Sequence, residues 1–524
     1  MPAVVIVGAG VGGISCAIAL KRKLNCEDFV IFEKASDVGG TWRDNIYPGA
    51  SSDIAIHFYS LSTDLNPDWS STHGTQADAL DYWRKLTTKY SLYPHLTLNT
   101  RVVSAVWNGS EYDVAVENLL TGEHSNITAK VVVSAIGILE MPKLPAIPGL
   151  ASFKGHKFHS ARWDTGVDLR GQRVAVIGNG ASATQFVPLI SEDPSVQITQ
   201  FCRTPNWLLP PARSKYSDTE KWIFRHVPLA LKAYRSMLYI RSELLYVAVF
   251  ARKSLRDMMT KRVKGYILAS SPEEMRGQLI PNYEIGCKRV LFDTDYLKCL
   301  HRPNMNLNWN RIQNITEQGL VTKNGEVLEF DVIIFATGFI ADKYPVHVVG
   351  DKGISVQEYY NSQGGPKAYC GTAIPGFPNF FLLAGPNTTT GHTSVILTEE
   401  IQINYILKLV KPILAGLVKT FTVTSRATDA YNELIHARLA RSVFVGCVSW
   451  YRTANGEGKV SSIFPGPMAL YAWWLRRPVW EHYEADGASD RWRSLIWWNT
   501  LAQMLNPLHY VGLMFGWFLT WVSG

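Results

Sequence analysis

The chain opens with Val4-Val5-Ile6-Val7-Gly8-Ala9-Gly10-Val11-Gly12-Gly13, and this stretch specifies how the first part of the protein is built. Its β-branched residues predict a short strand, its glycines predict a tight turn, and the apolar residues of 14–20 recur at helical spacing. A strand, a glycine-rich turn and a helix in this order are typical of a Rossmann-like dinucleotide-binding unit. The next predicted strand, 29–32, ends at Glu33, twenty residues after Gly13.

The same order of elements recurs near residue 172. Residues 173–177 form an apolar strand, Gly178-Asn179-Gly180-Ala181-Ser182-Ala183 and a helical stretch follow it, and the next strand ends at Arg203. Two further apolar strands, 131–137 and 331–338, end in similar turns and have the character of returning strands that close each unit. We therefore predict an α/β protein with two Rossmann-like dinucleotide-binding domains and a helical insertion. The predicted boundaries are 1–150 and 331–490 for the first domain, 151–212 and 286–330 for the second, 213–285 for the insertion and 491–524 for an apolar C-terminal tail.

The glycine turns suit the pyrophosphate of a dinucleotide. Glycines let the backbone approach the phosphates closely, and the free N–H groups and dipole at the start of the following helix favour negative charge. The candidate cofactor-binding residues at these turns are Gly8, Gly10 and Gly13 in the first unit and Gly178, Gly180, Ser182 and Ala183 in the second.

The strands that follow the two turns end in opposite charges. Glu33 is expected to accept hydrogen bonds from ribose hydroxyls, which suits FAD or NAD. Arg203 stands at the equivalent place of the second unit and can pair with a 2′-phosphate, which assigns NADPH to that unit. The alternatives are a solvated carboxylate and an ordinary surface arginine. Together the two units predict FAD that is reduced by NADPH.

Composition describes a folded protein large enough to enclose a cavity. The chain has 524 residues, of which 47% are apolar and 18% charged, and this excludes a disordered or low-complexity chain. The net charge of +8 is concentrated in residues 213–264, where thirteen Lys or Arg stand against four Asp or Glu. We interpret this segment as a solvated helical face, with membrane contact as the alternative. No recognition motif accompanies the charge, so nucleic acid is not indicated.

The seven cysteines are far apart, and none shows the two-residue spacing of a zinc ribbon or a thioredoxin-like motif. The chain also enters its first strand without the features of a secretory signal. We therefore predict reduced thiols, an intracellular protein and no bound metal. A flavin disulfide reductase shares both nucleotide folds, but it needs a close pair of redox cysteines, and the sequence spacing offers none.

The C-terminal end is strongly apolar. Residues 508–522 form a run of fifteen, which is shorter than the ~20 residues that a helix needs to span a bilayer. An extension back to Leu495 reaches that length only by including Pro507 and three polar amides. We predict a docked or interfacial helix, with a membrane anchor as the alternative, and hence a protein of the cytoplasm or of the cytoplasmic face of a membrane.

Three further motifs resemble those of the Baeyer–Villiger monooxygenases, within the wider class of flavin-containing monooxygenases. Residues 153–164, Phe-Lys-Gly-His-Lys-Phe-His-Ser-Ala-Arg-Trp-Asp, match the fingerprint F-x-G-x-x-x-H-x-x-x-W-[P/D] at every fixed position. Residues 39–53 resemble the G-G-x-W…Y-P-G-x-x-x-D segment, and Gly286-Cys287-Lys288-Arg289 resembles the active-site arginine turn. The resemblance covers about residues 3–395, and within the fingerprint it implies that His159 holds and moves the NADP domain rather than exchanging protons.

The resemblance implies a reaction in which NADPH reduces FAD, oxygen adds to the flavin, and the resulting anionic peroxide attacks a ketone to give an ester or lactone. An anionic peroxide needs a fixed cation that cannot lose its proton, and Arg289 is the candidate. Asp53 matches the acid that orients this arginine. The same pattern implies contacts with the flavin from Thr41, Trp42 and Tyr59, with the adenine from Val103, and with the 2′-phosphate from Thr204 and Lys288.

The partners expected are O2 and a small-molecule substrate, a hydrophobic ketone. The aromatic insertion and the apolar tail indicate a bulky ketone of secondary metabolism. Two alternatives stay open. One is an N- or S-oxygenating flavin monooxygenase, against which Asp53 and Arg289 argue together, and the other is a flavin-binding membrane scaffold without catalytic activity.

Overall fold

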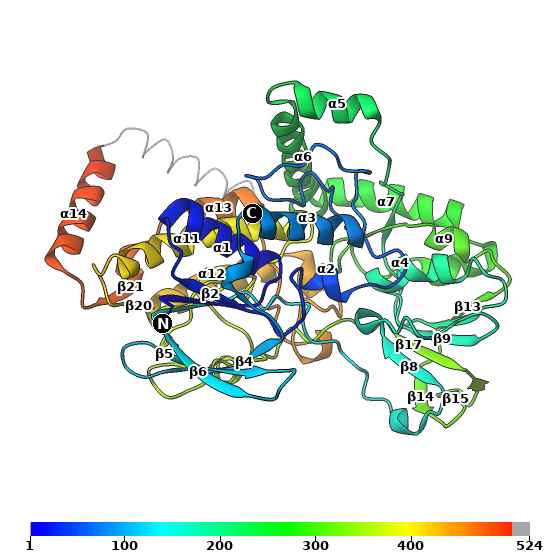
Figure 1. The fold of residues 1–524 in the computed structure, drawn as a ribbon. Helices are drawn as coiled ribbons and strands as arrows, with labels where there is room; N and C mark the ends of the chain where they lie inside the picture. Colours follow the sequence, from blue (N-terminus) through cyan, green and yellow to red (C-terminus); the bar gives the residue numbers. More distant parts are fainter. Residues whose placement is uncertain (1, 506–524) are drawn as a thin grey trace.

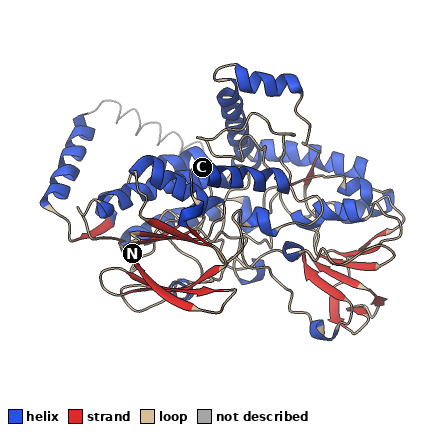
Figure 2. Cartoon of the chain, viewed as in Figure 1, coloured by secondary structure: helices blue, strands red, loops and turns tan. Residues whose placement is uncertain are grey.

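The structure, a computed structural model, describes residues 2–505. Two nucleotide-binding units lie side by side, and the helices of the insertion rise beside their junction (Figure 1). Figure 2 shows that the strands gather in separate groups with helices packed between and above them. The α/β fold predicted from the sequence is confirmed, because the main sheet of each unit is parallel and follows the expected strand–turn–helix order.

The first unit is built on a five-stranded parallel sheet with the order β19-β7-β1-β2-β3. Its strands are β1 (Val4–Val7), β2 (Phe29–Phe32), β3 (Leu96–Thr97), β7 (Val131–Ser134) and β19 (Phe380–Leu382). The helices packed with it are α1 (Val11–Leu24), α3 (Gln76–Lys89) and α11 (Val395–Leu414). A second sheet of this unit has the order β18-β4-β5-β6, with β4 (Thr100–Trp107), β5 (Tyr112–Asn118), β6 (His124–Ala129) and β18 (His347–Val349).

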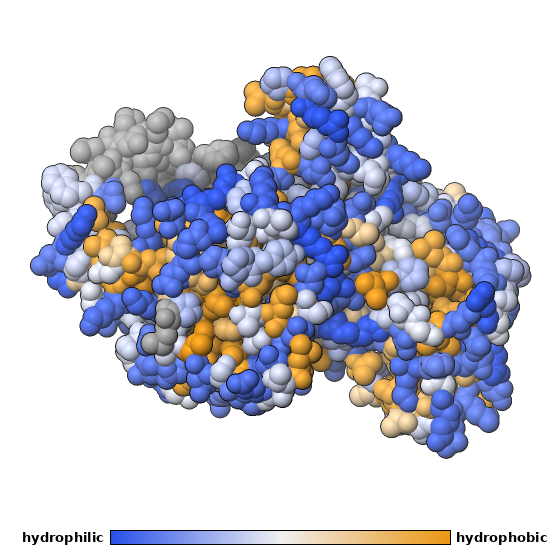
Figure 3. Space-filling model, viewed as in Figure 1, coloured by the Kyte–Doolittle hydropathy of each residue, from blue (hydrophilic) through white to orange (hydrophobic). Residues whose placement is uncertain are grey.

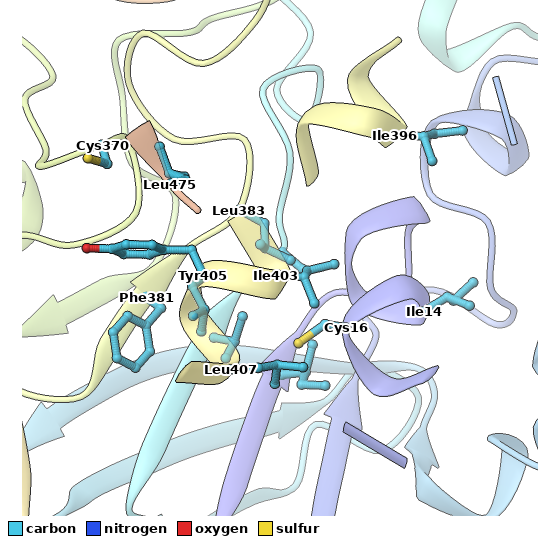
Figure 4. Packing of buried hydrophobic residues seen from close by; sticks show 14 of the residues in the cluster. Ile14, Cys16, Cys370, Phe381, Leu383, Ile396, Ile403, Tyr405, Leu407 and Leu475 are labelled. Carbon is cyan, nitrogen blue, oxygen red and sulfur yellow. The ribbon is translucent and has the colours of Figure 1, made fainter. Parts of the chain in front are cut away.

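Both faces of the first parallel sheet are buried, which explains why its strands read as continuous apolar runs. Ile6 of β1 belongs to the core shared with α1 and α11, whereas Val7 belongs to the core shared with β4 and β5. Figure 4 shows Cys16 of α1 close to Ile403 and Leu407 of α11 in the first of these cores. This packing holds the start of α1 rigidly over the glycine turn.

The second unit repeats the plan with the order β13-β10-β9-β17-β8, again all parallel. Its elements are β8 (His156–His159), β9 (Arg173–Ile177), α4 (Ala181–Ile190), β10 (Gln197–Phe201), α9 (Tyr296–Cys299), β13 (Met305–Asn308), β17 (Val332–Phe335) and the antiparallel hairpins β14 (Ile312–Ile315), β15 (Gly319–Thr322) and β16 (Val327–Glu329). Because β17 pairs with β8 and β9, this unit extends to Phe335, and the predicted boundary at 330 is one strand too early.

The insertion is mainly helical and is framed by a short parallel pair of strands. It contains β11 (Leu208–Leu209), α5 (Asp218–His226), α6 (Ala230–Tyr246), the π-helix η4 (Val247–Ala251), α7 (Lys253–Ser270), η5 (Glu273–Met275), α8 (Arg276–Leu279) and β12 (Leu291–Phe292). The remaining elements are α2 (Thr41–Asp44), η1 (Tyr93–His95), η2 (Leu150–Ser152), η3 (Ser160–Arg162), α10 (Val356–Ser362), β20 (Thr420–Val423), α12 (Ser425–Ala440), η6 (Val443–Val445), η7 (Ala454–Gly456), α13 (Met468–Trp474), η8 (Trp480–His482), β21 (Tyr483–Asp486) and α14 (Asp490–Leu505).

The C-terminal tail bears on the question of a membrane. Within residues 2–505, none of the helices has both the length and the hydropathy that crossing a bilayer requires. The apolar run 508–522 lies outside the described residues, so the interfacial helix or anchor expected there stays a prediction.

Candidate active site

The first glycine turn forms the cradle that the sequence predicts. Gly8 has a φ of +102°, a left-handed conformation that glycine adopts without strain. A Cβ at Gly13 would stand 1.9 Å from the carbonyl oxygen of Gly8, so only glycine fits where α1 crosses the turn. The helix begins at N-cap Gly10 without a side-chain cap, which leaves its first N–H groups to a ligand. The residues present therefore fit the pyrophosphate of FAD.

Glu33 lies buried at the end of β2, next to this turn. One carboxylate oxygen accepts a hydrogen bond from the backbone N–H of Ala9 at 2.8 Å, and the other accepts one from Ala35 at 3.0 Å. These bonds fix the carboxylate beside the cradle, where a ribose would follow the pyrophosphate. Val103, predicted to border the adenine, lies exposed at the bulge of β4.

The second unit brings Lys288 together with Arg203 and Thr204, which lie 84 or more positions earlier in the chain. Lys288 Nζ donates a hydrogen bond to Thr204 Oγ1, and the charge of Arg203 acts on the same ammonium. Burial and the charge of Arg203 lower the pKa of Lys288 to about 8. Two cations held close together favour a dianionic group between them, so this cluster fits the 2′-phosphate of NADPH. The helix α4 nearby begins at Gly180, also without a side-chain cap.

Asp53 and Arg289 meet at the junction of the two units. Nε and Nη2 of Arg289 donate to Oδ2 and Oδ1 of Asp53 at 2.6 and 2.7 Å, a bidentate pair whose side chains are 23% and 30% exposed. Burial opposes ionisation of Asp53, but the guanidinium outweighs it and lowers the pKa of the carboxyl. Burial likewise opposes the charge of Arg289, and Asp53 raises the pKa of the guanidinium above its usual value. The arginine is therefore a permanent, oriented cation.

The aromatic side chains of Tyr59 and Tyr451 lie near this pair. Trp42 on α2, directly after Thr41, packs edge-to-face against Tyr59 with ring centroids 5.5 Å apart. Tyr451 is fully buried, and burial raises the pKa of its hydroxyl to about 12 while the charge of Arg289 opposes that shift. Tyr451 was not predicted, because it lies beyond the region that the motifs cover and the sequence around it carries no motif.

Several buried polar atoms near the first cradle have no partner among the described residues. They are Trp42 Nε1, Asn387 Oδ1, Thr393 Oγ1, Ser394 Oγ, Glu399 Oε2 and Tyr451 OH, none of which has a hydrogen-bond partner within residues 2–505. Buried polar groups are normally satisfied, so a group of them in the loop before α11 and around Trp42 fits a bound cofactor with many hydrogen-bonding atoms. The helix α11 itself begins at Ser394 without a side-chain cap.

Glu399 is a second residue that the sequence reasoning missed. Its Oε1 lies 3.1 Å from the position that a Cβ of Gly12 would occupy, and burial raises the pKa of the carboxyl to about 8. The signal that could have revealed it is the acidic pair Glu399-Glu400 inside an otherwise apolar helical stretch.

His159 of the fingerprint is buried at the end of β8. Its Nδ1 accepts a hydrogen bond from the backbone N–H of Ala161 at 3.1 Å, and burial lowers the pKa of the imidazole to about 4. The ring is therefore neutral near pH 7, which suits a structural role at the crossing between the units.

Two cysteines contradict the prediction of seven reduced thiols. Cys287 and Cys447 form a disulfide across 160 residues, next to the turn that carries Arg289. Sequence spacing could not show the pair, because the two loops meet only through the packing of the insertion on the first unit. The remaining five cysteines are free, and four of them are buried.

Comparison with known proteins gives the family. A family model described as pyridine nucleotide-disulphide oxidoreductase matches residues 5–208. This region contains both glycine turns but neither cysteine of the disulfide, so the match reflects the nucleotide-binding units. A Baeyer–Villiger monooxygenase of Streptomyces coelicolor is 36% identical over 491 residues, covering 92% of each chain. The closed crystal structure of cyclohexanone monooxygenase has a TM-score of 0.82 at 26% identity, over 93% of this chain and 99% of that one. The crystal structure of OTEMO in complex with FAD and NADP has a TM-score of 0.79 at 26% identity, over 91% and 97%.

The two dinucleotide units and the arginine–aspartate pair between them define an FAD- and NADPH-dependent monooxygenase. The similarity over nearly the whole length makes the assignment more specific. The chain belongs to the Baeyer–Villiger monooxygenase family. The family and the fold predicted from the motifs are thereby confirmed, and the non-catalytic scaffold is disfavoured.

Proposed function

We propose that this enzyme converts a bulky hydrophobic ketone into an ester or lactone, with one oxygen atom taken from O2 and the electrons from NADPH. The observation that carries the proposal is the bidentate Asp53–Arg289 pair at the junction of the two nucleotide-binding units. The reaction requires a cation that stays charged beside a developing oxyanion, and the paired guanidinium meets that requirement.

The cofactor assignments of single residues belong to the same proposal. FAD would be held by Gly8, Gly10, Gly13 and Glu33, and bordered by Thr41, Trp42, Tyr59 and Val103. NADPH would be held by Gly178, Gly180, Ser182, Ala183, Arg203, Thr204 and Lys288. When bound, FAD supplies the redox chemistry that accepts hydride from NADPH and activates O2. The uncapped starts of α1 and α4 and the cationic cluster at Lys288 support these assignments.

Arg289 can act on the reaction while it is held by Asp53. A guanidinium has five N–H donors, and the aspartate engages two of them. The donors that remain on Nη1 and Nη2 can stabilise negative charge on a carbonyl oxygen under attack. Asp53 fixes the direction of these donors. Because it acts through Arg289 and does not itself contact the substrate, it is a positioning residue.

The apolar surroundings of the arginine turn support the proposed substrate class. Phe250 of η4 packs against Phe444 with stacked rings 5.1 Å apart, and the turn at Gly286 touches Phe250. Such a wall favours an apolar ketone over a charged amine or thiolate. A role in secondary metabolism and an intracellular location complete the proposal.

The decisive experiment is product analysis under ¹⁸O2. The FAD-loaded enzyme and NADPH are incubated with a panel of cyclic ketones and with an amine and a thioether, and products are identified by mass spectrometry. A lactone carrying one ¹⁸O atom supports the proposal, whereas an N-oxide or sulfoxide as the sole product contradicts it. The variant Arg170→Gln, which alters an exposed Asp–Arg pair away from the junction, serves as the control for Arg289→Gln.

A further inference from the structure

The helices α5 and α6 form a hairpin that projects from the body of the molecule (Figure 1). The helix α5 begins with a capping box between Ser217 and Glu220, yet none of its nine residues is buried. Phe224 is partly buried against the core, whereas the outward positions of the helix receive no stabilisation from core packing and are free to be polar. Instead, it carries large apolar side chains on the outside.

The outward side chains of this hairpin are apolar. Trp222 is 56% exposed, and Leu229, at the connection between the helices, is 71% exposed. On α6, Met237, Ile240 and Leu244 are exposed at helical spacing, on the side opposite the buried residues. Figure 3 shows hydrophobic residues on the projecting end of the molecule, with hydrophilic residues beside them. We call the exposed apolar residues of α5, α6 and their connection the apolar tip: Trp222, Ile223, Val227, Leu229, Met237, Ile240 and Leu244.

The hairpin is firmly attached at its base, so the exposure of the apolar tip is built into the fold. The ring of Phe224 packs against His57 and Tyr234 with centroids 4.9 and 5.0 Å apart. Nη1 of Arg235 donates to the backbone carbonyl oxygen of His57 at 2.6 Å, and Nη2 lies 3.7 Å from Glu400 on α11. The aromatic cluster and the arginine hold α5 and α6 in place while their outer sides face solvent.

Basic residues lie beside the side chains of the apolar tip. Residues 217–246, which form α5, α6 and their connection, hold five Lys or Arg against three Asp or Glu, and most of the excess of nine in 213–264 lies outside them. Of these five, Arg225 pairs with Asp68 and Arg235 lies near Glu400. Lys221 precedes Trp222 directly, Lys232 follows Leu229 by one turn, and Arg241 adjoins Ile240. Tryptophan and aliphatic side chains surrounded by Lys and Arg are the composition of helices that lie in the interface of an anionic bilayer.

We propose that the apolar tip docks on an anionic lipid surface, with its tryptophan and aliphatic side chains at headgroup depth and the neighbouring cations against the lipid phosphates. A solvated face, as predicted from the charge alone, does not explain the exposed apolar side chains. A second copy of the chain is disfavoured as the occupant, because two copies that meet at their apolar tips would bring Lys221, Lys232 and Arg241 of one copy against the same cations of the other. The proposal does not depend on the reaction that the enzyme catalyses.

The test is sedimentation of the full-length, FAD-loaded enzyme with vesicles of phosphatidylcholine alone or mixed with phosphatidylglycerol. We expect binding to the mixed vesicles that weakens as salt is added. The double variant Trp222→Glu/Leu229→Glu is expected to bind at least about tenfold more weakly. The matched control Leu120→Glu/Val327→Glu changes side chains that are 76% and 68% exposed elsewhere, and we expect it to bind like the wild type.

Each contrary result would overturn the proposal. These results are no binding to mixed vesicles, equal binding by the Trp222→Glu/Leu229→Glu variant, or loss of binding only in Trp497→Ser/Trp498→Ser, which alters exposed residues of α14. A dimer in sedimentation equilibrium that the apolar-tip variant disrupts would assign the surface to a second copy. Circular dichroism and retained NADPH oxidation check the fold, and Lys221→Glu/Lys232→Glu provides a second variant that leaves the apolar side chains intact.

Discussion

Removing the partner of Arg289 should cost most of the activity without removing the cation. In Asp53→Asn the side chain keeps its volume but loses the charge that accepts two hydrogen bonds, at 2.6 and 2.7 Å. A charge-assisted hydrogen bond contributes about 1.5–3 kcal/mol when buried, and partial exposure of both side chains reduces the sum of the two to about 2–3 kcal/mol. If this free energy holds the guanidinium in its productive orientation, kcat/KM falls by about 100-fold, since 2.7 kcal/mol corresponds to two factors of ten.

A double-mutant cycle on lactone formation measures this directly. We expect Arg289→Gln to lose about 10³-fold in kcat/KM, as for removal of one oxyanion donor. The double variant Asp53→Asn/Arg289→Gln should be no slower than Arg289→Gln alone, because the aspartate acts only through the arginine. The cycle Asp168→Asn/Arg170→Gln, on an exposed pair, should leave the rate unchanged.

The reasoning is refuted if the losses of Asp53→Asn and Arg289→Gln multiply in the double variant, because the two residues would then act independently. It is equally refuted if Arg289→Gln forms lactone at the wild-type rate while flavin reduction by NADPH is unchanged in all variants.

Three further outcomes follow from the structure. The pKa of Lys288 is lowered to about 8, so the KM for NADPH should rise as the pH passes that value, because the ammonium loses its proton. The rise should be absent in Lys288→Met, which starts from a KM about tenfold higher. Initial rates with NADPH and NADH check this, and a parallel change of KM with NADH would contradict it. Burial raises the pKa of Glu399 to about 8, so between the ordinary pKa of a glutamate and pH 8 the folded state binds more protons than the unfolded state. The melting temperature should therefore decline as the pH rises towards 8, and it should decline less in Glu399→Gln. Identical dependence of the melting temperature on pH in the two proteins would argue against this. Cys447→Ser removes a cross-link that closes a loop of 160 residues, so it should lower the free energy of unfolding by about 2–4 kcal/mol. Dithiothreitol should lower the melting temperature of the wild type and leave that of the variant unchanged. A wild-type protein that melts at the same temperature with and without the reductant would contradict the disulfide.

The nucleotide-binding units were predictable because their geometry is set by residues close together in the chain. The positive φ of Gly8 and the missing side chain of Gly13 permit one tight turn, and the turn determines where α1 begins. The strand end at Glu33 follows from the same local pattern. The strand at 331–338 was expected to close a unit, but the predicted boundary at 330 left it outside the second one, because the sheet that a strand joins depends on its pairing, here of β17 with β8 and β9.

Local order along the chain thus settled the two units, the cofactor classes that suit them and the family. Which distant segments touch was settled by packing, since a contact between loops depends on how every element between them is arranged. Asp53 meets Arg289 across 236 residues, Cys287 meets Cys447 across 160, and Glu399 reaches the glycine turn from a helix near the other end of the chain. The same packing leaves Trp222 and Leu229 outside, because a residue type states a preference for burial and only the assembled fold provides or withholds a partner surface.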